Sequence, residues 1–156
     1  MKKYLSAGFV IAALGAGGWL LSPAGAANGA AGGLTEITVY KTPQCGCCKG
    51  WVAHLRDNGF AVKVIEREDL DPIKLRMGVP ENLGSCHTAT LDGYAVEGHV
   101  PAKDIRRLLA EKPAARGLAV PGMPVGAPGM EQDNQHDPYN VIIFNDKGEG
   151  KVFASY

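Results

Sequence analysis

The sequence has no excess of charge of either sign. Its 156 residues carry 16 lysines and arginines against 16 aspartates and glutamates. Proteins that bind nucleic acid neutralise phosphates with clustered basic residues, and proteins that dock on anionic membranes carry polybasic segments. Neither feature is present, so we expect neither nucleic acid nor the membrane surface as a partner. The sequence also lacks internal repeats and a second domain, and its length suits one hydrophobic core.

Only the N-terminus carries a long apolar run. Met1-Lys2-Lys3 is a short basic start, residues 5–21 are apolar or small, and Ala24-Gly25-Ala26 places small residues where a signal peptidase recognises them. This order is typical of a secretory signal peptide. An uncleaved membrane anchor is the alternative, but three glycines interrupt the run and favour cleavage. We therefore expect residues 1–26 to be a signal peptide and residues 27–33 a flexible lead-in to an exported protein.

All four cysteines lie in the expected mature part. Three fall within four residues, Cys45-Gly46-Cys47-Cys48, and the fourth is Cys86. Four cysteines in an exported chain commonly form two disulfides. Adjacent Cys47 and Cys48 can hardly bridge each other, so a fully bonded chain would join Cys45 to Cys48 and Cys47 to Cys86. The clustering favours a soft-metal site over this alternative, which stays open.

The spacing of apolar residues predicts alternating strands and helices. In chain order we expect strand 36–40, helix 47–58, strand 60–65, helix 71–77, strands 88–91 and 94–97, helix 101–111, and strands 139–144 and 151–153. Asp92-Gly93 predicts a tight hairpin turn, and Asp71 is expected to cap its helix. The β-α-β-α-β-β-α order predicts an α/β domain over residues 34–113. Residues 114–156 form a C-terminal extension, with a long loop over 117–138.

The first predicted helix should set the directions of the cysteine side chains. Four residues follow an i, i+3, i+4, i+7 pattern and should form one buried face: Cys48, Trp51, Val52 and Leu55. Cys45 and Cys47 should then lie near the rim of the domain. A helix N-terminus stabilises thiolates there, because it presents unpaired N–H groups and the positive end of a dipole.

The residue types favour copper over other soft metals. Thiolate ligands select Cu(I), zinc or iron–sulfur clusters. Zinc prefers separated ligand pairs in a closed tetrahedron, whereas three cysteines in four residues suit sulfurs shared by several Cu(I) ions. Met123 and Met130 lie in the Pro- and Gly-rich loop, and thioethers also favour Cu(I) over zinc. Taken alone, the two methionines are better explained as gap-filling residues in a linker.

Two resemblances extend this interpretation. The order of elements resembles the thioredoxin fold, and Cys45-Gly46-Cys47-Cys48-Lys49 resembles its C-G-P-C-K motif with cysteine in place of proline. From about Thr38 to Met130 the chain also resembles the CopG-type copper-resistance proteins of Gram-negative bacteria. The motifs that carry this second resemblance are Cys45-Gly46-Cys47-Cys48, Ser85-Cys86-His87-Thr88, Glu97-Gly98-His99-Val100-Pro101 and Val120-Pro121-Gly122-Met123.

The family resemblance implies a periplasmic protein with a thioredoxin-like domain. In it, cysteines and residues of the C-terminal extension hold a multinuclear copper cluster. The expected metal ligands are Cys45, Cys47, Cys48, Cys86, His87, Met123 and Met130. Cys86 should complete a four-sulfur site, which a separation of more than about 7 Å from every other thiol would exclude.

The remaining histidines and Trp51 have smaller expected roles. His99, at a strand end near Pro101, is a candidate for supporting the ligands, and its own ligation of metal stays open. His54 should be solvated. For His136 two interpretations stay equally open: exposure to solvent and an occasional contact with metal. Trp51 should belong to the core.

Three functions remain open. The first is copper resistance through a cluster of several Cu(I)/Cu(II) ions that acts as a copper oxidoreductase. Its partners would be copper ions and other periplasmic copper-handling or electron-transfer proteins. The second is a thiol–disulfide oxidoreductase with catalytic Cys45 and Cys48, of which Cys45 is the nucleophile and Cys48 the resolving thiol. The third is a passive copper chaperone or store.

Overall fold

This computed structural model describes residues 34–156. The described residues contain a seven-stranded mixed sheet. The expected signal peptide and lead-in lie outside the described residues. The elements are β1 (Thr35–Lys41), α1 (Gly46–Asp57), β2 (Phe60–Glu66), α2 (Asp71–Arg76), the 3₁₀ turn η1 (Glu81–Leu83), β3 (His87–Leu91), β4 (Tyr94–Glu97), α3 (Ala102–Glu111), β5 (Gly117–Ala119), β6 (Asn140–Phe144) and β7 (Gly150–Ser155).

The strands lie in the order β2-β1-β3-β4-β5-β6-β7. The β1–β2 and β4–β5 pairs are parallel, and the other pairs are antiparallel. This arrangement confirms the predicted α/β class. The β-α-β-α-β-β-α order that runs from β1 to α3 is compatible with the thioredoxin-like fold that the resemblance implies.

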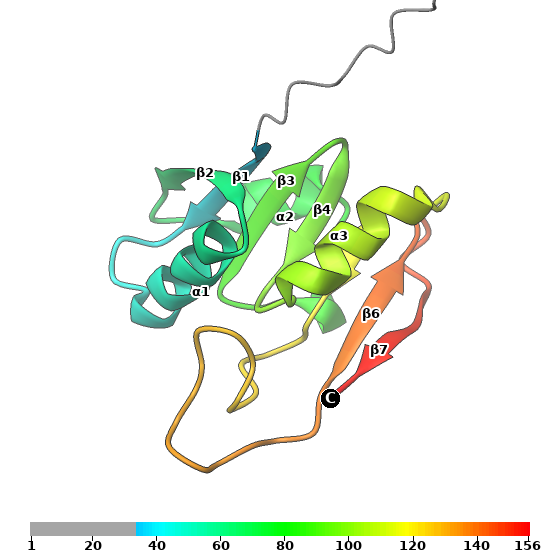
Figure 1. Cartoon of the computed structure of the whole chain (residues 1–156). Coiled ribbons are helices and arrows are strands. Elements are labelled where there is room, and N and C mark those ends of the chain that lie inside the picture. The colour runs from blue at the N-terminus through cyan, green and yellow to red at the C-terminus, as the bar shows by residue number, and fades with distance from the viewer. Residues whose placement is uncertain (1–33) are drawn as a thin grey trace, which may run out of the picture. The chain divides into compact units, whose positions relative to one another are not determined.

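Helices cover both faces of the sheet. Figure 1 shows α1 and α3 on one face and α2 on the other. Neighbouring strand residues point to opposite faces, so Val96 packs in the larger core beneath α1 and α3, while Ala95 packs with Leu83 and Phe144 on the opposite side. The predicted inner face of α1 is confirmed, because Cys48, Trp51, Val52 and Leu55 are all buried. Trp51 is a core residue, as expected.

The expected loop over 117–138 is wrong at its start. Gly117–Ala119 forms the buried strand β5, parallel to β4 and antiparallel to β6. Three residues are too short a run to show periodicity. Glycine is required at position 117 because a Cβ there would collide with the backbone of Ala95. Through β5 the C-terminal hairpin of β6 and β7 continues the central sheet.

The turn at Asp92-Gly93 is confirmed, and the cap at Asp71 is wrong. Asp92 and Gly93 have φ of 46° and 82°, the left-handed conformations that a tight two-residue hairpin needs. Leu70 is the N-cap of α2, and Asp71 is its first helical residue. The carboxylate of Asp69 accepts a hydrogen bond from the Asp71 N–H at 2.9 Å, so the polar group that organises this turn comes from two residues earlier.

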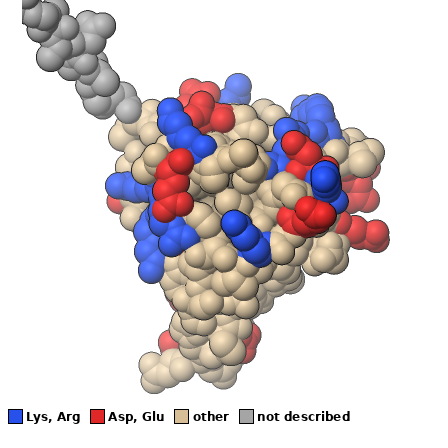
Figure 2. Space-filling model, turned by 90° about the vertical axis from the view of Figure 1, so that its right-hand side faces the viewer, with Lys and Arg blue, Asp and Glu red and all other residues tan. Residues whose placement is uncertain are grey.

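Charges of both signs are mixed on the surface that Figure 2 shows. Exposed pairs such as Arg107 and Glu111, 3.5 Å apart, join neighbouring turns of α3. This face therefore agrees with the balanced composition of the chain. Among the described residues, no helix combines the length and the apolar character needed to span a membrane.

Two tyrosines fasten the C-terminal end of the chain. The rings of Tyr139 and Tyr156 stack with their centroids 4.9 Å apart, and the Tyr156 hydroxyl donates to the buried carboxylate of Asp104. Burial raises the pKa of Tyr139 to about 12, and the charges of Asp104 and Glu131 act in the same direction. Burial and the Asp104 hydrogen bond also raise the pKa of Tyr156. The folded state therefore favours neutral phenols.

We expect the free energy of unfolding to fall as the pH rises above about 10, the ordinary tyrosine pKa, because the unfolded chain then loses these protons first. In Tyr139→Phe the fall should be shallower, since one of the two phenols can no longer ionise. Urea unfolding at pH 9, 10 and 11 measures it. An identical pH dependence in the wild type and in Tyr139→Phe would contradict the assignment.

Candidate functional site

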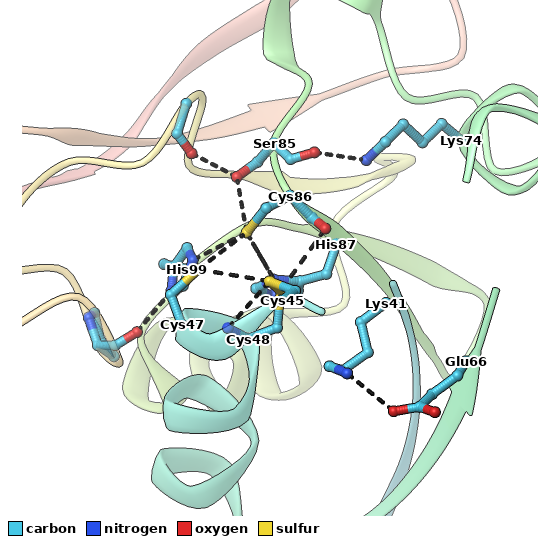
Figure 3. Close-up of a disulfide and its surroundings, with 12 residues drawn as sticks. Lys41, Cys45, Cys47, Cys48, Glu66, Lys74, Ser85, Cys86, His87 and His99 are labelled. Atoms are coloured by element: carbon cyan, nitrogen blue, oxygen red, sulfur yellow. Dashed lines mark hydrogen bonds and ion pairs between the residues drawn. A yellow bond between two sulfur atoms is a disulfide. The ribbon is translucent and has the colours of Figure 1, made fainter. Parts of the chain in front are cut away.

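The cysteine motif lies at the beginning of α1, where β1 has ended and the chain turns into the helix (Figure 3). Cys45 is the N-cap residue, and its sulfur accepts a hydrogen bond from the Cys48 N–H at 3.3 Å. This sulfur thus takes the role that a serine or aspartate oxygen has in most helices. Cys45 and Cys48 form a disulfide with Cα atoms 5.4 Å apart. Cys48 is buried, and Cys45 and Cys47 are half-buried.

Cys86 reaches this motif from across the fold. It directly precedes β3, and its Sγ lies 3.5 Å from Cys48 Sγ and 3.9 Å from Cys47 Sγ. Cys47 Sγ in turn lies 3.5 Å from Cys45 Sγ. All four sulfurs are within 4.8 Å of one another, well inside the limit that would have excluded a shared site. Of the two disulfides in the alternative pairing, the structure contains the first, while Cys47 and Cys86 are free thiols.

Two imidazoles flank Cys86. His87 Nδ1 lies 3.3 Å and His99 Nε2 3.2 Å from its sulfur. His99, a candidate supporting residue from the sequence, contacts the sulfur directly and forms a second group of potential metal ligands with Cys86 and His87. Because the end of β4 pairs with the start of β3, a histidine just after β4 lies near Cys86, but this pairing is known only from the fold. Desolvation by burial lowers the pKa of both histidines, so both rings are neutral.

The two other histidines lie away from the sulfurs. His54, expected to be solvated, is half-buried instead, and its Nε2 accepts a hydrogen bond from the Ala102 N–H at 3.1 Å. It therefore satisfies a free N–H at the start of α3. His136 is exposed, and its Nδ1 lies 3.0 Å from the backbone oxygen of Asp137.

The donor set fits a soft metal cation. Burial raises the pKa of the Cys86 thiol to about 12, and a negative charge on Cys47 acts in the same direction. The free thiol is therefore protonated at neutral pH. A cation bound between the sulfurs supplies the positive charge that such a thiol needs in order to ionise. Sulfur and neutral imidazole are ligands that Cu(I) accepts, whereas oxygen-seeking cations do not prefer them.

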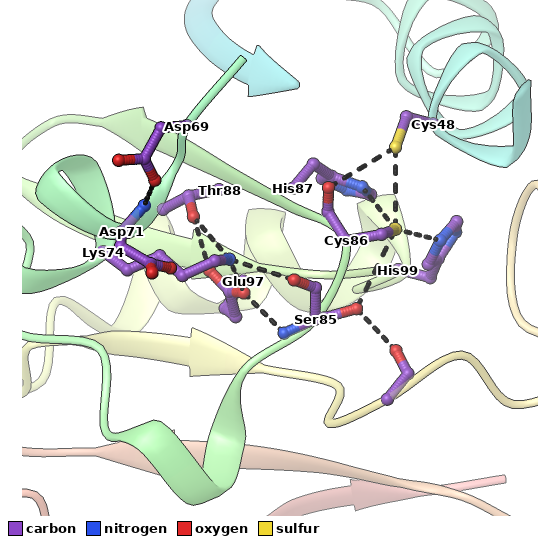
Figure 4. Close-up of polar contacts among 11 residues, drawn as sticks. Cys48, Asp69, Asp71, Lys74, Ser85, Cys86, His87, Thr88, Glu97 and His99 are labelled. Atoms are coloured by element: carbon purple, nitrogen blue, oxygen red, sulfur yellow. Dashed lines mark hydrogen bonds and ion pairs between the residues drawn. The ribbon is translucent and has the colours of Figure 1, made fainter. Parts of the chain in front are cut away.

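A buried ion pair fixes the backbone just before Cys86 (Figure 4). Glu97 is fully buried, and its carboxylate accepts hydrogen bonds from the Ser85 N–H and the Thr88 hydroxyl, each at 2.6 Å. Lys74 directs its ammonium group to Glu97, to Thr88 Oγ1 at 3.1 Å and to the Ser85 carbonyl at 3.0 Å. Burial raises the pKa of the Glu97 carboxyl, and Lys74 counteracts this effect. Both backbone groups of Ser85 are thus held by one ion pair, which no sequence pattern predicted.

The C-terminal extension packs against the site through its backbone. The Gly122 carbonyl accepts a hydrogen bond from Ser85 Oγ, and the Pro128 carbonyl lies 2.8 Å from His99 Nδ1. Met123 is 55% exposed and Met130 is half-buried. The loop of residues 121–130 is therefore beside the cysteines, as the resemblance implies, and copper ligation by either thioether stays a prediction.

Gly129 sets how closely this loop approaches α1. A Cβ at this position would collide with the Trp51 backbone nitrogen and lie 3.0 Å from the Cys47 carbonyl oxygen, and Gly129 has φ of +82°. We expect Gly129→Ala to displace the loop from the site and to destabilise the protein by about 1–3 kcal/mol, since both the clash and the left-handed backbone disfavour a side chain.

Urea unfolding, together with the alkylation rate of Cys47, measures this displacement. Gly46→Ala is the matched control, because a Cβ at Gly46 meets nothing within 4 Å. Equal stability and equal alkylation rates in Gly129→Ala and the wild type would contradict the prediction.

Comparisons with known proteins place these features in context. A family model described as "Protein of unknown function, DUF411" matches residues 83–130, which include Cys86 and His99 but not the motif at 45–48. Two solved structures, titled as forms 1 and 2 of the copper resistance protein CopG, are each 47% identical to this chain. Each match covers 79% of this chain and 98% of the other, with TM-scores of 0.75 for form 1 and 0.76 for form 2. No curated protein matches the chain.

Proposed function

This chain belongs to the CopG family of copper resistance proteins, and we propose that it is exported to the periplasm and binds several copper ions there in the service of copper tolerance. The observation that carries the proposal is the meeting of four cysteine sulfurs within 4.8 Å. They come from two segments of the chain, since Cys86 follows Cys47 by 39 positions.

Each ligand has a distinct place in the proposed site. Buried Cys48 would hold copper on the protein side, and the half-buried Cys45, Cys47 and Cys86 would hold it nearer the surface. Sulfurs this close favour shared ligation of several ions over one closed tetrahedron. His87, Met123 and Met130 complete the expected set, so the extension of residues 114–156 serves the site of the domain formed by residues 34–113. The buried walls around Cys48 keep water from the inner sulfurs.

The site is also proposed to be redox-active. Bound copper supplies a one-electron couple between Cu(I) and Cu(II). The half-buried position of Cys45 and Cys47 keeps one side of the site open to another periplasmic copper-handling or electron-transfer protein. Reversible one-electron turnover in voltammetry would separate this role from that of a passive chaperone or store.

Metal analysis tests the proposal. The mature chain, residues 27–156, is fully reduced, loaded with copper and freed of unbound metal. We expect more than one copper per chain, with an absorption band from sulfur-to-copper charge transfer. Less than one copper per chain would defeat the proposal. The control is the chain with both Cys47→Ser and Cys86→Ser, which leaves only two of the four sulfurs.

The disulfide supports a second candidate function, thiol–disulfide exchange. Half-buried Cys45 would be the attacking thiol and buried Cys48 the resolving one. Cys47 argues against this role, because its thiol lies 3.5 Å from Cys45 Sγ and competes for the same disulfide. Insulin reduction by Cys47→Ala, in a protein whose parent retains no copper after loading, would favour exchange over copper binding.

A further inference from the structure

The disulfide form of the site still offers two thiols. Cys47 and Cys86 are free, and their sulfurs are 3.9 Å apart. Two thiolates that bind one metal ion through bonds of about 2.3 Å, with an angle near 120° between them, lie about 4.0 Å apart. The observed spacing therefore suits a shared ion as it stands. Joining Cys45 to Cys48 removes two of the four ligands without moving this pair out of range.

His99 is prepared to be the third ligand. Its Nδ1 lies 2.8 Å from the Pro128 carbonyl oxygen, so the ring proton resides on Nδ1 and is donated to that carbonyl. The lone pair on Nε2 then faces Cys86 Sγ, 3.2 Å away. Histidines that ligate metals usually donate their other ring N–H to a carbonyl or carboxylate in this way, which fixes both tautomer and ring orientation.

His87 is less suited to this role. Its Nδ1 faces the same sulfur, but its ring packs between Trp51 and His99, with centroid distances of 4.4 and 4.9 Å. His87 Nε2 is buried and has no hydrogen-bond partner among the residues that the structure describes. Its Nε2 thus lacks a carbonyl partner of the kind that fixes the tautomer of His99.

We propose that, while Cys45 and Cys48 are joined as a disulfide, the Cys47 and Cys86 sulfurs and Nε2 of His99 form a smaller site that binds one Cu(I) ion. This inference rests on the proposed copper function and adds a redox state to it. Binding releases the two thiol protons to solvent and changes no oxidation state. The protein would keep one copper ion when oxidation of the first cysteine pair dismantles the larger site.

The test uses the mature chain in its disulfide form. Alkylation followed by peptide mass spectrometry first verifies that only Cys47 and Cys86 are free. Anaerobic titration with Cu(I) in competition with a chromophoric Cu(I) chelator then measures the number of Cu(I) ions bound per chain and the affinity of each variant for Cu(I). We expect one Cu(I) per chain, with two sulfur ligands and one nitrogen ligand in X-ray absorption. Cys47→Ser should remove it, and His99→Phe should weaken it by about 10- to 100-fold, the range seen for changes around metal ligands.

Two further variants make the result decisive. Cys45→Ser with Cys48→Ser leaves Cys47, Cys86 and His99 without any need for controlled oxidation, and should also bind one Cu(I). His54→Gln is the control, because it removes an imidazole that is already occupied by the Ala102 N–H, and should bind as the wild type does.

The outcomes distinguish this inference from the function on which it rests. A reduced protein that binds several copper ions, beside a disulfide form that binds none, would overturn only the smaller site. The same holds if mild oxidation joins Cys47 to Cys86, or if His99→Phe binds Cu(I) as tightly as the wild type. Failure of the reduced protein to bind copper would instead overturn the proposed function.

Discussion

Replacing Cys86 with serine should remove most of the copper that the fully reduced protein holds. Cys86 Sγ is within 3.9 Å of both Cys47 and Cys48 and within 3.3 Å of two imidazole nitrogens. It is thus the one thiol that joins the helix motif to the histidines. Changes to residues that merely support a ligand cost about 10- to 100-fold in metal affinity, so loss of this sulfur should cost at least a hundredfold.

Chelator competition on reduced protein measures the change, and far-ultraviolet circular dichroism confirms that the variant is folded. Ala53→Ser on the exposed side of α1 is the control, since it introduces the same hydroxyl outside the site. If Cys86→Ser retains the copper number and affinity of the wild type, the four-sulfur site does not exist as proposed, and copper is held by the Cys45-Gly46-Cys47-Cys48 motif alone.

Replacing Glu97 with alanine should destabilise the fold by about 3 kcal/mol. Removing one partner of a buried ion pair leaves an uncompensated charge, which typically costs about 3–5 kcal/mol. Lys74 keeps 18% of its side chain exposed, so water compensates in part and the lower end applies. Because Glu97 and Lys74 also hold the backbone of Ser85, Cys86 should lose its fixed position and copper affinity should fall with stability.

Urea unfolding measures the stability loss, and a paired substitution separates charge from packing. Lys74→Met with Glu97→Leu removes both charges and should recover part of the stability, since a buried pair is replaceable by apolar residues. It should not recover copper affinity, because the backbone N–H and carbonyl of Ser85 then lose the partners that hold them. Glu111→Ala breaks the exposed pair with Arg107 and should cost less than about 1 kcal/mol. A loss in Glu97→Ala no larger than in Glu111→Ala would contradict the role of the pair.

Most of the fold could be predicted from local patterns. Each of these features depends on residues no more than about four positions apart: the inner face of α1, the Asp92-Gly93 hairpin, and the alternation of strands and helices. Such short-range patterns are visible in a sequence. β5 could not be predicted in the same way. Its three residues, Gly117–Ala119, form a strand because β4 and β6 lie on either side of it, and that information comes from the tertiary structure.

The candidate site likewise has features that could be predicted from the sequence and features that depend on the tertiary structure. The sequence placed three sulfurs at the start of one helix, and the resemblance to the thioredoxin fold, in which the loop before the third strand packs beside that motif, implied that Cys86 would join them. The direct contact of His99 with Cys86 depends on the path of the chain after β4 and on the Pro128 carbonyl, 29 positions later. The Lys74–Glu97 pair depends on three segments meeting in the core. Composition and spacing carry no trace of such long-range pairings.

The reach of the site across the chain has a consequence for the lifetime of the protein. Unfolding separates Cys86 from the cysteines of α1, so only the native state presents all four sulfurs together. A ligand that binds only the native state stabilises it by about 2.7 kcal/mol at a hundred times its dissociation constant. Proteases degrade chains in proportion to the time they spend open. Copper bound as proposed would therefore slow proteolysis of this protein, and its abundance should rise with the copper supply.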